Sequence, residues 1–248
     1  MPLALSFTAL TSGFLRIALP EHCAVCGVRA DRQMCGVCAQ VFDAGQPAAD
    51  RPIRCLRCAA AMQTGAANCR TRVCDQCLAW SPAFDHSLAL ADYRPPLDRL
   101  MMRLKFHGRL PLAREFGLRL ADALGERGIA DDTLLVPVPL ARERLVTRGF
   151  NQAWEIARVA ARRLQRPADA HCLRRVRETA QQSRLERAAR QRNLRTVFAA
   201  GAAVRDRAVV LVDDVMTTGA TCHEAADALK QAGAREVTAA VVLRTRHS

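Results

Sequence analysis

The chain has 248 residues, of which half are apolar and 25% are charged. Such a chain is globular, and its length leaves room for one α/β domain and a small accessory module. The formal net charge is +13, and the excess is local, because residues 140–207 hold 17 arginines and only 6 acidic residues. An arginine-rich block of this kind suits a polyanionic small substrate or a nucleic acid, although a solvated helix face explains most of its arginines.

The first 19 residues are largely apolar, but Thr8, Gly13 and Arg16 are among the residues that interrupt the run. The segment therefore lacks the length and purity of a membrane span. It also lacks the basic start and the cleavage site of a signal peptide. We expect a cytoplasmic protein without a membrane span, whose opening segment is a short amphipathic helix packed on the body.

Cysteines are concentrated in the N-terminal third, where nine of the eleven lie between Cys23 and Cys77. Eight of the nine form Cys-x-x-Cys pairs, namely Cys23/Cys26, Cys35/Cys38, Cys55/Cys58 and Cys74/Cys77. Each pair is half of a tetrahedral zinc site, so the segment predicts two structural zinc ions. Spacing alone leaves open whether neighbouring pairs combine or the pairs cross, and it leaves Cys69 as an odd thiol.

Zinc is favoured over the other uses of these cysteines. Disulfides need an oxidising compartment, for which the sequence carries no export signal, and four successive pairs argue for structure rather than redox catalysis. Such a module is too small for a core of its own and would depend on metal to fold. Cysteines nearly stop after Trp80-Ser81-Pro82, so we expect a zinc module with its preceding helix at residues 1–80 and a catalytic body at residues 81–248.

The body begins with alternating strand and helix patterns. Residues 87–93 read as a strand, residues 97–106 as a helix that ends at Gly108, and residues 111–124 as a second helix with a buried apolar face. Residues 134–140 predict a strand that ends in prolines. Prolines stop the strand at the ligand-binding edge of a sheet and stiffen the loop that follows.

The stretch Ala141–Gln152 carries Arg142, Arg144 and Arg148, and it leads into a helix with an apolar face over residues 153–164. We expect this stretch to be a mobile, cationic lid. A lid that closes over a diphosphate excludes water and supplies charge where the leaving group develops it.

Two strands and one basic segment complete the body outside its central motif. Residues 171–176 predict a strand, and residues 236–244 predict another that returns parallel to the central strand. Residues 177–195 are polar and strongly basic. Their composition fits an exposed helix and a segment over the active site about equally well.

The chain is organised around residues 207–233. The β-branched run Ala208–Val212 predicts a buried parallel strand that ends on Asp213 and Asp214. A hydroxyl-rich turn at residues 215–221 follows and leads into an amphipathic helix. Ligands of open α/β sheets bind at the carboxyl ends of the strands, where the following helix directs free N–H groups at a phosphate.

The string LVDDVMTTGAT at residues 211–221 resembles the ribose-phosphate signature of type I phosphoribosyltransferases. The resemblance implies that Asp213 and Asp214 hold the ribose hydroxyls of phosphoribosyl pyrophosphate, beside the Mg²⁺ that the diphosphate brings. In the implied site, the loop around the 5-phosphate consists of Thr217, Thr218, Gly219, Ala220 and Thr221. Pro139 and Leu140 border the diphosphate. The cations that neutralise it are Arg142, Arg148 and Lys105.

Several landmarks together resemble the ComF family, the competence-associated and gluconate-operon-type phosphoribosyltransferase relatives. The landmarks are the paired cysteines, residues 104–108, 136–140 and 148–153, the spaced residues Arg175, Thr179, Gln182, Leu185, Arg190 and Asn193, and the signature. The resemblance covers nearly the whole chain in order. It implies an α/β fold with a type I phosphoribosyltransferase-like parallel sheet flanked by helices, a small N-terminal zinc-binding module, and a role in DNA uptake and natural transformation. Relatives work with a DNA-translocating helicase, which makes single-stranded DNA and such a helicase implied partners.

One residue departs from the related purine enzymes. In 6-oxopurine phosphoribosyltransferases an acid commonly stands at the position of Thr217 and serves the purine as a base, and threonine cannot ionise usefully there. This departure disfavours a purine-salvage enzyme and leaves the acceptor open. The oligomeric state is also open. Three hypotheses remain: a phosphoribosyltransferase, a module that senses phosphoribosyl pyrophosphate without chemistry, and a DNA-handling accessory protein. We favour the first, with the third as a compatible second activity.

Overall fold

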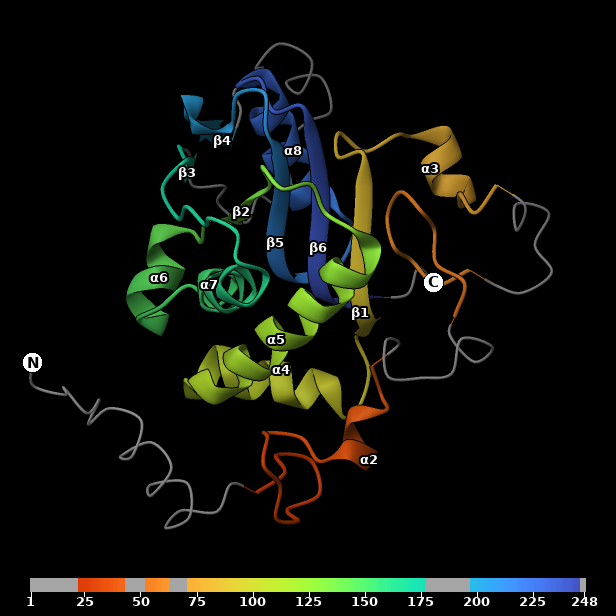
Figure 1. The fold of residues 1–248 in the computed structure, drawn as a ribbon, viewed down its shortest axis with the longest axis vertical. Helices are drawn as coiled ribbons and strands as arrows, with labels where there is room; N and C mark the ends of the chain where they lie inside the picture. The colour runs from red at the N-terminus through yellow and green to blue at the C-terminus, as the bar shows by residue number, and fades with distance from the viewer. Residues whose placement is uncertain (1–21, 43–51, 63–70, 177–196, 246–248) are drawn as a thin grey trace, which may run out of the picture.

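The structure is a computed structural model that describes residues 22–42, 52–62, 71–176 and 197–245. At its centre is a four-stranded parallel sheet with the strand order β1-β6-β5-β2 (Figure 1). The strands are β1 (His86–Asp92), β2 (Leu134–Pro137), β5 (Ala208–Met216) and β6 (Glu236–Arg244). Helices cover both faces, as parallel strands require. The predicted fold class, a parallel sheet flanked by helices, is confirmed.

Strand β5 is longer than its sequence pattern indicated. We expected the strand to end on the two acids, but it continues past them to Met216. Pairing with β6 accounts for the extension, because Val215 lies opposite Leu243 and Met216 lies opposite Arg244. The two acids therefore belong to the strand itself rather than to the loop after it.

Three helices cover one face of the sheet: α4 (Leu97–His107), α5 (Leu110–Arg127) and α7 (Gln152–Leu164). Their apolar residues recur at helical spacing and form a shared core with Val210 and Val212. Helices α5 and α7 approach closely at Gly117, where an added Cβ would lie 2.7 Å from the carbonyl oxygen of Ile156. The helices expected here are confirmed, including the end of α4 at Gly108, which has a φ of 60°.

Helix α8 (Ala220–Gln231) covers the opposite face and packs on Val209 and Leu211. A two-stranded antiparallel sheet of β3 (Leu173–Arg175) and β4 (Phe198–Ala200) lies against the same core, followed by the 3-10 turn η5 (Ala202–Val204). The strand expected at residues 171–176 is thus present, but it pairs outside the main sheet.

The segment after β2 forms a helix. The strand ends at Pro137, and Val138 still donates its N–H to the carbonyl of Val212 at 2.8 Å. Pro139 and Leu140 then lead into α6 (Arg142–Arg148), which ends at Gly149 in the left-handed region with a φ of 79°. The stretch expected to be a lid is therefore a short, exposed helix beside the sheet edge.

The cysteine-rich segments form two bodies at different places on the molecule. Residues 22–42 with α2 (Gly36–Ala39) lie against α4 and α5, whereas residues 52–62 and 71–79 with α3 (Asp75–Ala79) lie beside β1 (Figure 1). The first body shares its core with the sheet domain, because Met34 and Phe42 belong to the same buried group as Phe116. The N-terminal region is thus two small units attached separately to the body.

Three features expected from the sequence lie outside the described residues: the helix at residues 1–19, the thiol of Cys69, and the basic segment at residues 177–195. In the described part of the chain, every helix is too short or too polar to cross a membrane.

Candidate functional site

Asp213 and Asp214 lie at the carboxyl end of β5, where the sequence placed the ligand site. Successive side chains of a strand point to opposite faces, so the two carboxylates diverge. Asp214 lies on the face of α4 and pairs through Oδ1 with Nζ of Lys105 at 3.0 Å. Asp213 lies on the face of α8 and accepts the backbone N–H of Asp214 at 2.8 Å. The structure thus joins two of the predicted site residues, Lys105 and Asp214, although they are far apart in sequence.

The acid pair is strongly perturbed by its surroundings. Burial is the main cause that raises the pKa of Asp213 to about 8, and the charge of Asp214 adds to it while Lys105 opposes it. Asp214 is 4% exposed, and its Oδ2 has no hydrogen-bond partner among the described residues. A buried carboxylate oxygen without a donor is costly, so this atom is suited to a donor supplied by a ligand.

Residues 217–221, which we call the phosphate loop, run from the end of β5 into the first turn of α8. Gly219 lies in the left-handed region with a φ of 85° and is the N-cap residue of α8, and Oγ1 of Thr218 accepts the N–H of Ala220 at 3.3 Å. Thr217, Thr218 and Thr221 are exposed. The first N–H groups of a helix lack intrahelical partners and carry its positive dipole end. The loop therefore exposes hydroxyls beside the amides of a helix N-terminus, and its role as a phosphate site stays a prediction.

The loop after β2 runs beside β5 on the same edge. Pro139 and Leu140 are half-buried there. Asn151 supports the loop by donating from Nδ2 to the carbonyl of Val138 at 3.0 Å, while its Oδ1 caps α7 by accepting the N–H of Ala153 at 3.0 Å. The predicted diphosphate border is thus held from behind by a side chain that also starts a helix.

A cavity of about 630 Å³ lies between α4, α6 and the end of β1, next to Lys105. We call it the aromatic cavity, because Tyr93, Phe106 and Phe150 line it together with Arg144 and Arg148. The guanidinium of Arg148 lies over the ring of Phe106, 5.5 Å from its centroid. Burial lowers the pKa of Arg148, and the nearby Asp214 opposes that shift. The cavity therefore combines flat apolar surfaces with positive charge.

Sequence reasoning located this region only in part. Arg148 and Lys105 line the aromatic cavity, but Arg142 is exposed at the start of α6 and is not part of the lining. Arg144 takes its place. Tyr93 was missed, and Phe106 was noted only as part of the landmark at residues 104–108, because only the packing of α4 and β1 against α6 brings the two rings together.

The eight paired cysteines form two clusters by joining sequential pairs, which decides the question that spacing left open. The first cysteine cluster is Cys23, Cys26, Cys35 and Cys38, and the second is Cys55, Cys58, Cys74 and Cys77, with the sulfurs of each cluster within 4.8 Å of one another. Two sulfur pairs, one in each cluster, are 3.7 Å apart. Sulfurs at the corners of a tetrahedron around Zn²⁺ are about 3.8 Å apart for a bond of about 2.3 Å, so both clusters fit zinc.

The thiols of the second cluster affect one another's ionisation. A hydrogen bond from Cys58 is the main cause that lowers the pKa of Cys55 to about 4, and the same contact raises the pKa of Cys58 far above its usual range. Burial raises the pKa of Cys77 to about 12. Cysteines bind zinc as thiolates, so a Zn²⁺ ion held by this cluster would displace the protons of its remaining thiols.

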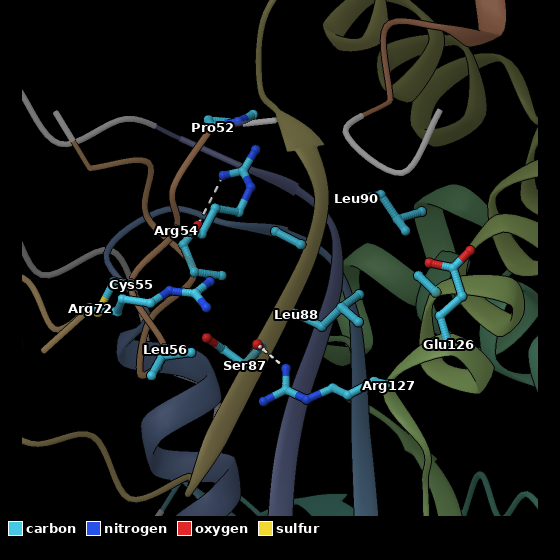
Figure 2. A pocket seen from close by; sticks show the side chains of 13 residues that line it. Pro52, Arg54, Cys55, Leu56, Arg72, Ser87, Leu88, Leu90, Glu126 and Arg127 are labelled. Carbon is cyan, nitrogen blue, oxygen red and sulfur yellow. Dashed lines mark hydrogen bonds between the residues drawn. The ribbon is translucent and has the colours of Figure 1, made fainter. Parts of the chain in front are cut away.

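A second hollow, of about 400 Å³, lies between the second cysteine cluster and the edge strand β1 (Figure 2). Arg54 and Cys55 line it from the cluster and Ser87 from the strand, and Arg127 donates from Nη1 to the carbonyl of Ser87 at 2.7 Å (Figure 2). It is separated from β5 by β6, so it is distinct from the acid pair.

Comparison with known proteins finds relatives over most of the chain. The family described as "Phosphoribosyl transferase domain" matches residues 152–248. The "DNA utilization protein YhgH" of Salmonella typhimurium is 33% identical over 249 residues, which cover 99% of this chain and 94% of that protein. The "Competence protein F" of Haemophilus influenzae is 32% identical over 171 residues, 66% of this chain and 75% of that protein. A crystal structure from Thermus thermophilus aligns with a TM-score of 0.35 at 26% identity, over 55% of this chain and 84% of that one.

Proposed function

Because the chain belongs to the ComF family of proteins with a phosphoribosyltransferase domain, we propose that it binds phosphoribosyl pyrophosphate with Mg²⁺ and transfers the phosphoribosyl group to an acceptor. The observation that carries the proposal is the acid pair at the edge of β5. Asp214 offers a buried carboxylate oxygen that lacks a donor among the described residues, directly before a loop of exposed threonines and a helix N-terminus. Ribose hydroxyls and a 5-phosphate are the matching groups on one ligand.

Each part of the ligand has a place in this arrangement. The 5-phosphate is held by the phosphate loop and the first N–H groups of α8, and the ribose lies across the end of β5 between the two diverging carboxylates. Pro139 and Leu140 would border the diphosphate and its Mg²⁺, and Lys105, which pairs with Asp214, would neutralise part of its charge. Asp214 Oδ2 is covered without ligand, so binding requires a local shift of the side chains around it.

The aromatic cavity is the place for the acceptor. It adjoins Lys105, which holds Asp214, and its rings offer stacking surfaces to a planar base while Arg144 and Arg148 favour an acceptor with negative charge. In the reaction the bond from the anomeric carbon to the diphosphate breaks and a bond to the acceptor atom forms. The protein contributes by orienting both partners and by neutralising the departing diphosphate, without a covalent intermediate.

Release of pyrophosphate tests the proposal. Wild-type protein with Mg²⁺, phosphoribosyl pyrophosphate and a panel of purine, pyrimidine and pyridine bases is expected to release pyrophosphate with at least one base, and Asp214→Ala is expected to abolish the release. Phe106 is 64% exposed, so Phe106→Ala leaves the fold intact. Loss of one stacking contact of about 1–3 kcal/mol is expected to raise KM for the base by about 5- to 150-fold and to leave KM for the sugar unchanged.

The outcomes separate the enzyme from a sensor. Saturable binding of phosphoribosyl pyrophosphate without turnover on any acceptor identifies a module that senses this ligand. Absence of both binding and turnover in folded, zinc-loaded protein contradicts the proposal.

A DNA-handling activity is the second candidate, favoured by charge and by the relatives' names. The net charge is +13, and similar proteins are called DNA utilization protein and competence protein. Basic proteins that neutralise DNA phosphates lose affinity steeply with salt. Binding of single-stranded DNA that weakens at least about tenfold between about 50 and 200 mM salt supports this activity, and an affinity that does not change with salt excludes it.

The cysteine clusters suit a reducing cytoplasm, where we place the protein and a DNA-translocating helicase partner.

A further inference from the structure

Arg244, the last residue of β6, carries a guanidinium that is completely buried, with 0% of the residue exposed. Arginine stays charged in proteins and has five N–H donors in a rigid planar fork. A charge in this position is tolerated only where acceptors surround it. Its acceptors therefore show which parts of the chain it fixes.

The fork of Arg244 connects the second cysteine cluster to the phosphate loop. On one side Nε donates to the carbonyl of Cys58 at 2.9 Å. On the other side Nη1 donates to the carbonyl of Met216 at 3.1 Å and to the carbonyl of Thr217, which begins the phosphate loop. One rigid group thus spans from a cluster residue to the entrance of the loop.

A second connection joins the same two regions. Trp80 directly follows α3 of the second cluster, and its ring lies 4.4 Å from the ring of His223 in the first turn of α8. His223 also accepts the N–H of Ala83 on Nδ1 at 2.9 Å. The start of α8 is therefore held by the segment that leaves the second cluster.

The second cysteine-rich unit, residues 52–62 and 71–79, is also anchored to the sheet. Arg54 donates from Nη2 to Oδ1 of Asp92 at 2.9 Å, and both side chains are largely buried, at 13% and 5% exposed. Through Nη1 the same arginine donates to the carbonyl of Ala59, within the cluster's own loop, at 2.9 Å (Figure 2). A change in the conformation of this loop therefore reaches the sheet edge directly.

The first cysteine cluster has different neighbours and provides a natural control. Its segment contacts α4 through Arg103, which donates to the carbonyl of Ala24 at 2.8 Å, and contacts α5 through the rings of Phe42 and Phe116, 6.2 Å apart. These contacts lie on helices that cover the face opposite to α8. Loss of the first metal therefore leaves the acceptors of Arg244 and the start of α8 in place.

We propose that Arg244 is a positioning residue through which metal binding at the second cysteine cluster fixes the phosphate loop, so that metal and sugar phosphate bind cooperatively. The sugar-phosphate half of this inference rests on the proposed function. Without metal the Cys55–Cys77 segment loses its cross-link, the carbonyl of Cys58 moves, and the fork of Arg244 no longer holds Met216 and Thr217 in one geometry. Coupling between two sites is reciprocal, so the ligand must strengthen metal binding by the same factor.

Two matched cysteine variants test the proposal in the full-length protein. Cys35 and Cys74 occupy the same position in the two clusters, because each is the N-cap residue of the short helix that follows. Cys74→Ser is expected to weaken binding of phosphoribosyl pyrophosphate with Mg²⁺ about tenfold, within the usual range of coupling, and Cys35→Ser is expected to leave it within about twofold. Equal effects of the two variants, or no effect of either, would overturn the proposal.

A readout that needs no ligand separates this inference from the proposed function. Amide hydrogen exchange of residues 216–222 is expected to speed up in Cys74→Ser and to stay unchanged in Cys35→Ser. If wild-type protein binds no phosphoribosyl pyrophosphate, the proposed function fails, but faster exchange confined to the second-cluster variant still supports the connection. Unchanged exchange in both folded variants overturns it.

Arg244→Lys tests the residue itself, because lysine keeps the charge but offers its donors on one nitrogen, which cannot bridge both sides as the fork does. In Arg244→Lys the further effect of Cys74→Ser on ligand affinity is expected to shrink from about tenfold to about twofold or less. Additive effects contradict a role for Arg244.

If Cys74→Ser does not fold, the zinc affinity of the second cluster is measured in Cys35→Ser with and without phosphoribosyl pyrophosphate. A tenfold higher zinc affinity with the ligand supports the proposal, and an unchanged zinc affinity overturns it.

Discussion

Replacing Asp214 by asparagine tests whether this carboxylate accepts a ribose hydroxyl. In the structure Oδ1 of Asp214 is paired with Nζ of Lys105 at 3.0 Å, and Oδ2 has no donor among the described residues. Lysine has only donors, so the amide oxygen of asparagine takes the place of Oδ1 and its NH₂ group takes the place of Oδ2. The substitution therefore turns the unoccupied acceptor into a donor with little change in shape.

The magnitude follows from the kind of bond that is lost. A hydrogen bond to a charged group contributes about 1.5–3 kcal/mol and a neutral one about 0.5–1.5 kcal/mol. Wild-type protein is expected to prefer ribose 5-phosphate over its 2-deoxy or 3-deoxy analogue by about 10- to 150-fold. Asp214→Asn is expected to lower the larger of these preferences about tenfold.

The ratio of dissociation constants removes a competing effect. Loss of one negative charge strengthens binding of every phosphate ligand, but it acts equally on ribose 5-phosphate and its deoxy analogues and cancels in the ratio. The constants are measured by calorimetry or by competition, with Asp122→Asn as the control because that side chain is 49% exposed and belongs to α5. An unchanged preference in Asp214→Asn would refute the reasoning.

Three further results are expected. Protein purified under reducing conditions contains two zinc ions per chain by atomic emission, because both cysteine clusters have sulfurs 3.7 Å apart, and a content of one or none contradicts the assignment. Asp213 has a pKa of about 8 in the folded protein against 3.8 for the free group, so its contribution to the free energy of unfolding falls as pH rises from about 4 to about 8. Urea unfolding should show that Asp213→Asn gains stability relative to wild type at about pH 8.5 but not at about pH 4, and equal differences at both pH values contradict the burial argument. Gly219 has a φ of 85°, and a Cβ added there would have room, because the nearest atom, Sδ of Met216, is 3.7 Å away. Gly219→Ala should therefore lower the free energy of unfolding by about 1–2 kcal/mol through backbone strain alone. No change in thermal unfolding would contradict the left-handed turn.

Patterns within one segment were sufficient for most of the secondary structure. The apolar spacing of α4 and α5 and the β-branched run of β5 depend on short-range periodicity, which the sequence displays directly. The end of β5 could not be read in this way. Its last residues are held by β6, and the partner strand decides how far a strand extends.

Contacts between distant segments account for what the sequence did not reveal. The ion pair of Lys105 with Asp214 and the rings of Tyr93 and Phe106 in the aromatic cavity arise from packing of α4, β1 and α6. The signature and the cysteine pairs were recognisable because their residues are adjacent in the chain. Arg244 gave no signal, since an arginine at the end of an apolar strand looks like an ordinary surface residue.

Calorimetric titration of zinc-loaded protein with phosphoribosyl pyrophosphate and Mg²⁺ tests the central claim most directly. The account expects saturable binding of one ligand per chain, weakened at least about tenfold in Asp213→Ala and in Asp214→Ala, while both variants keep a cooperative unfolding transition. Absence of binding heat across several temperatures in folded wild-type protein, or wild-type affinity in both variants, would contradict it.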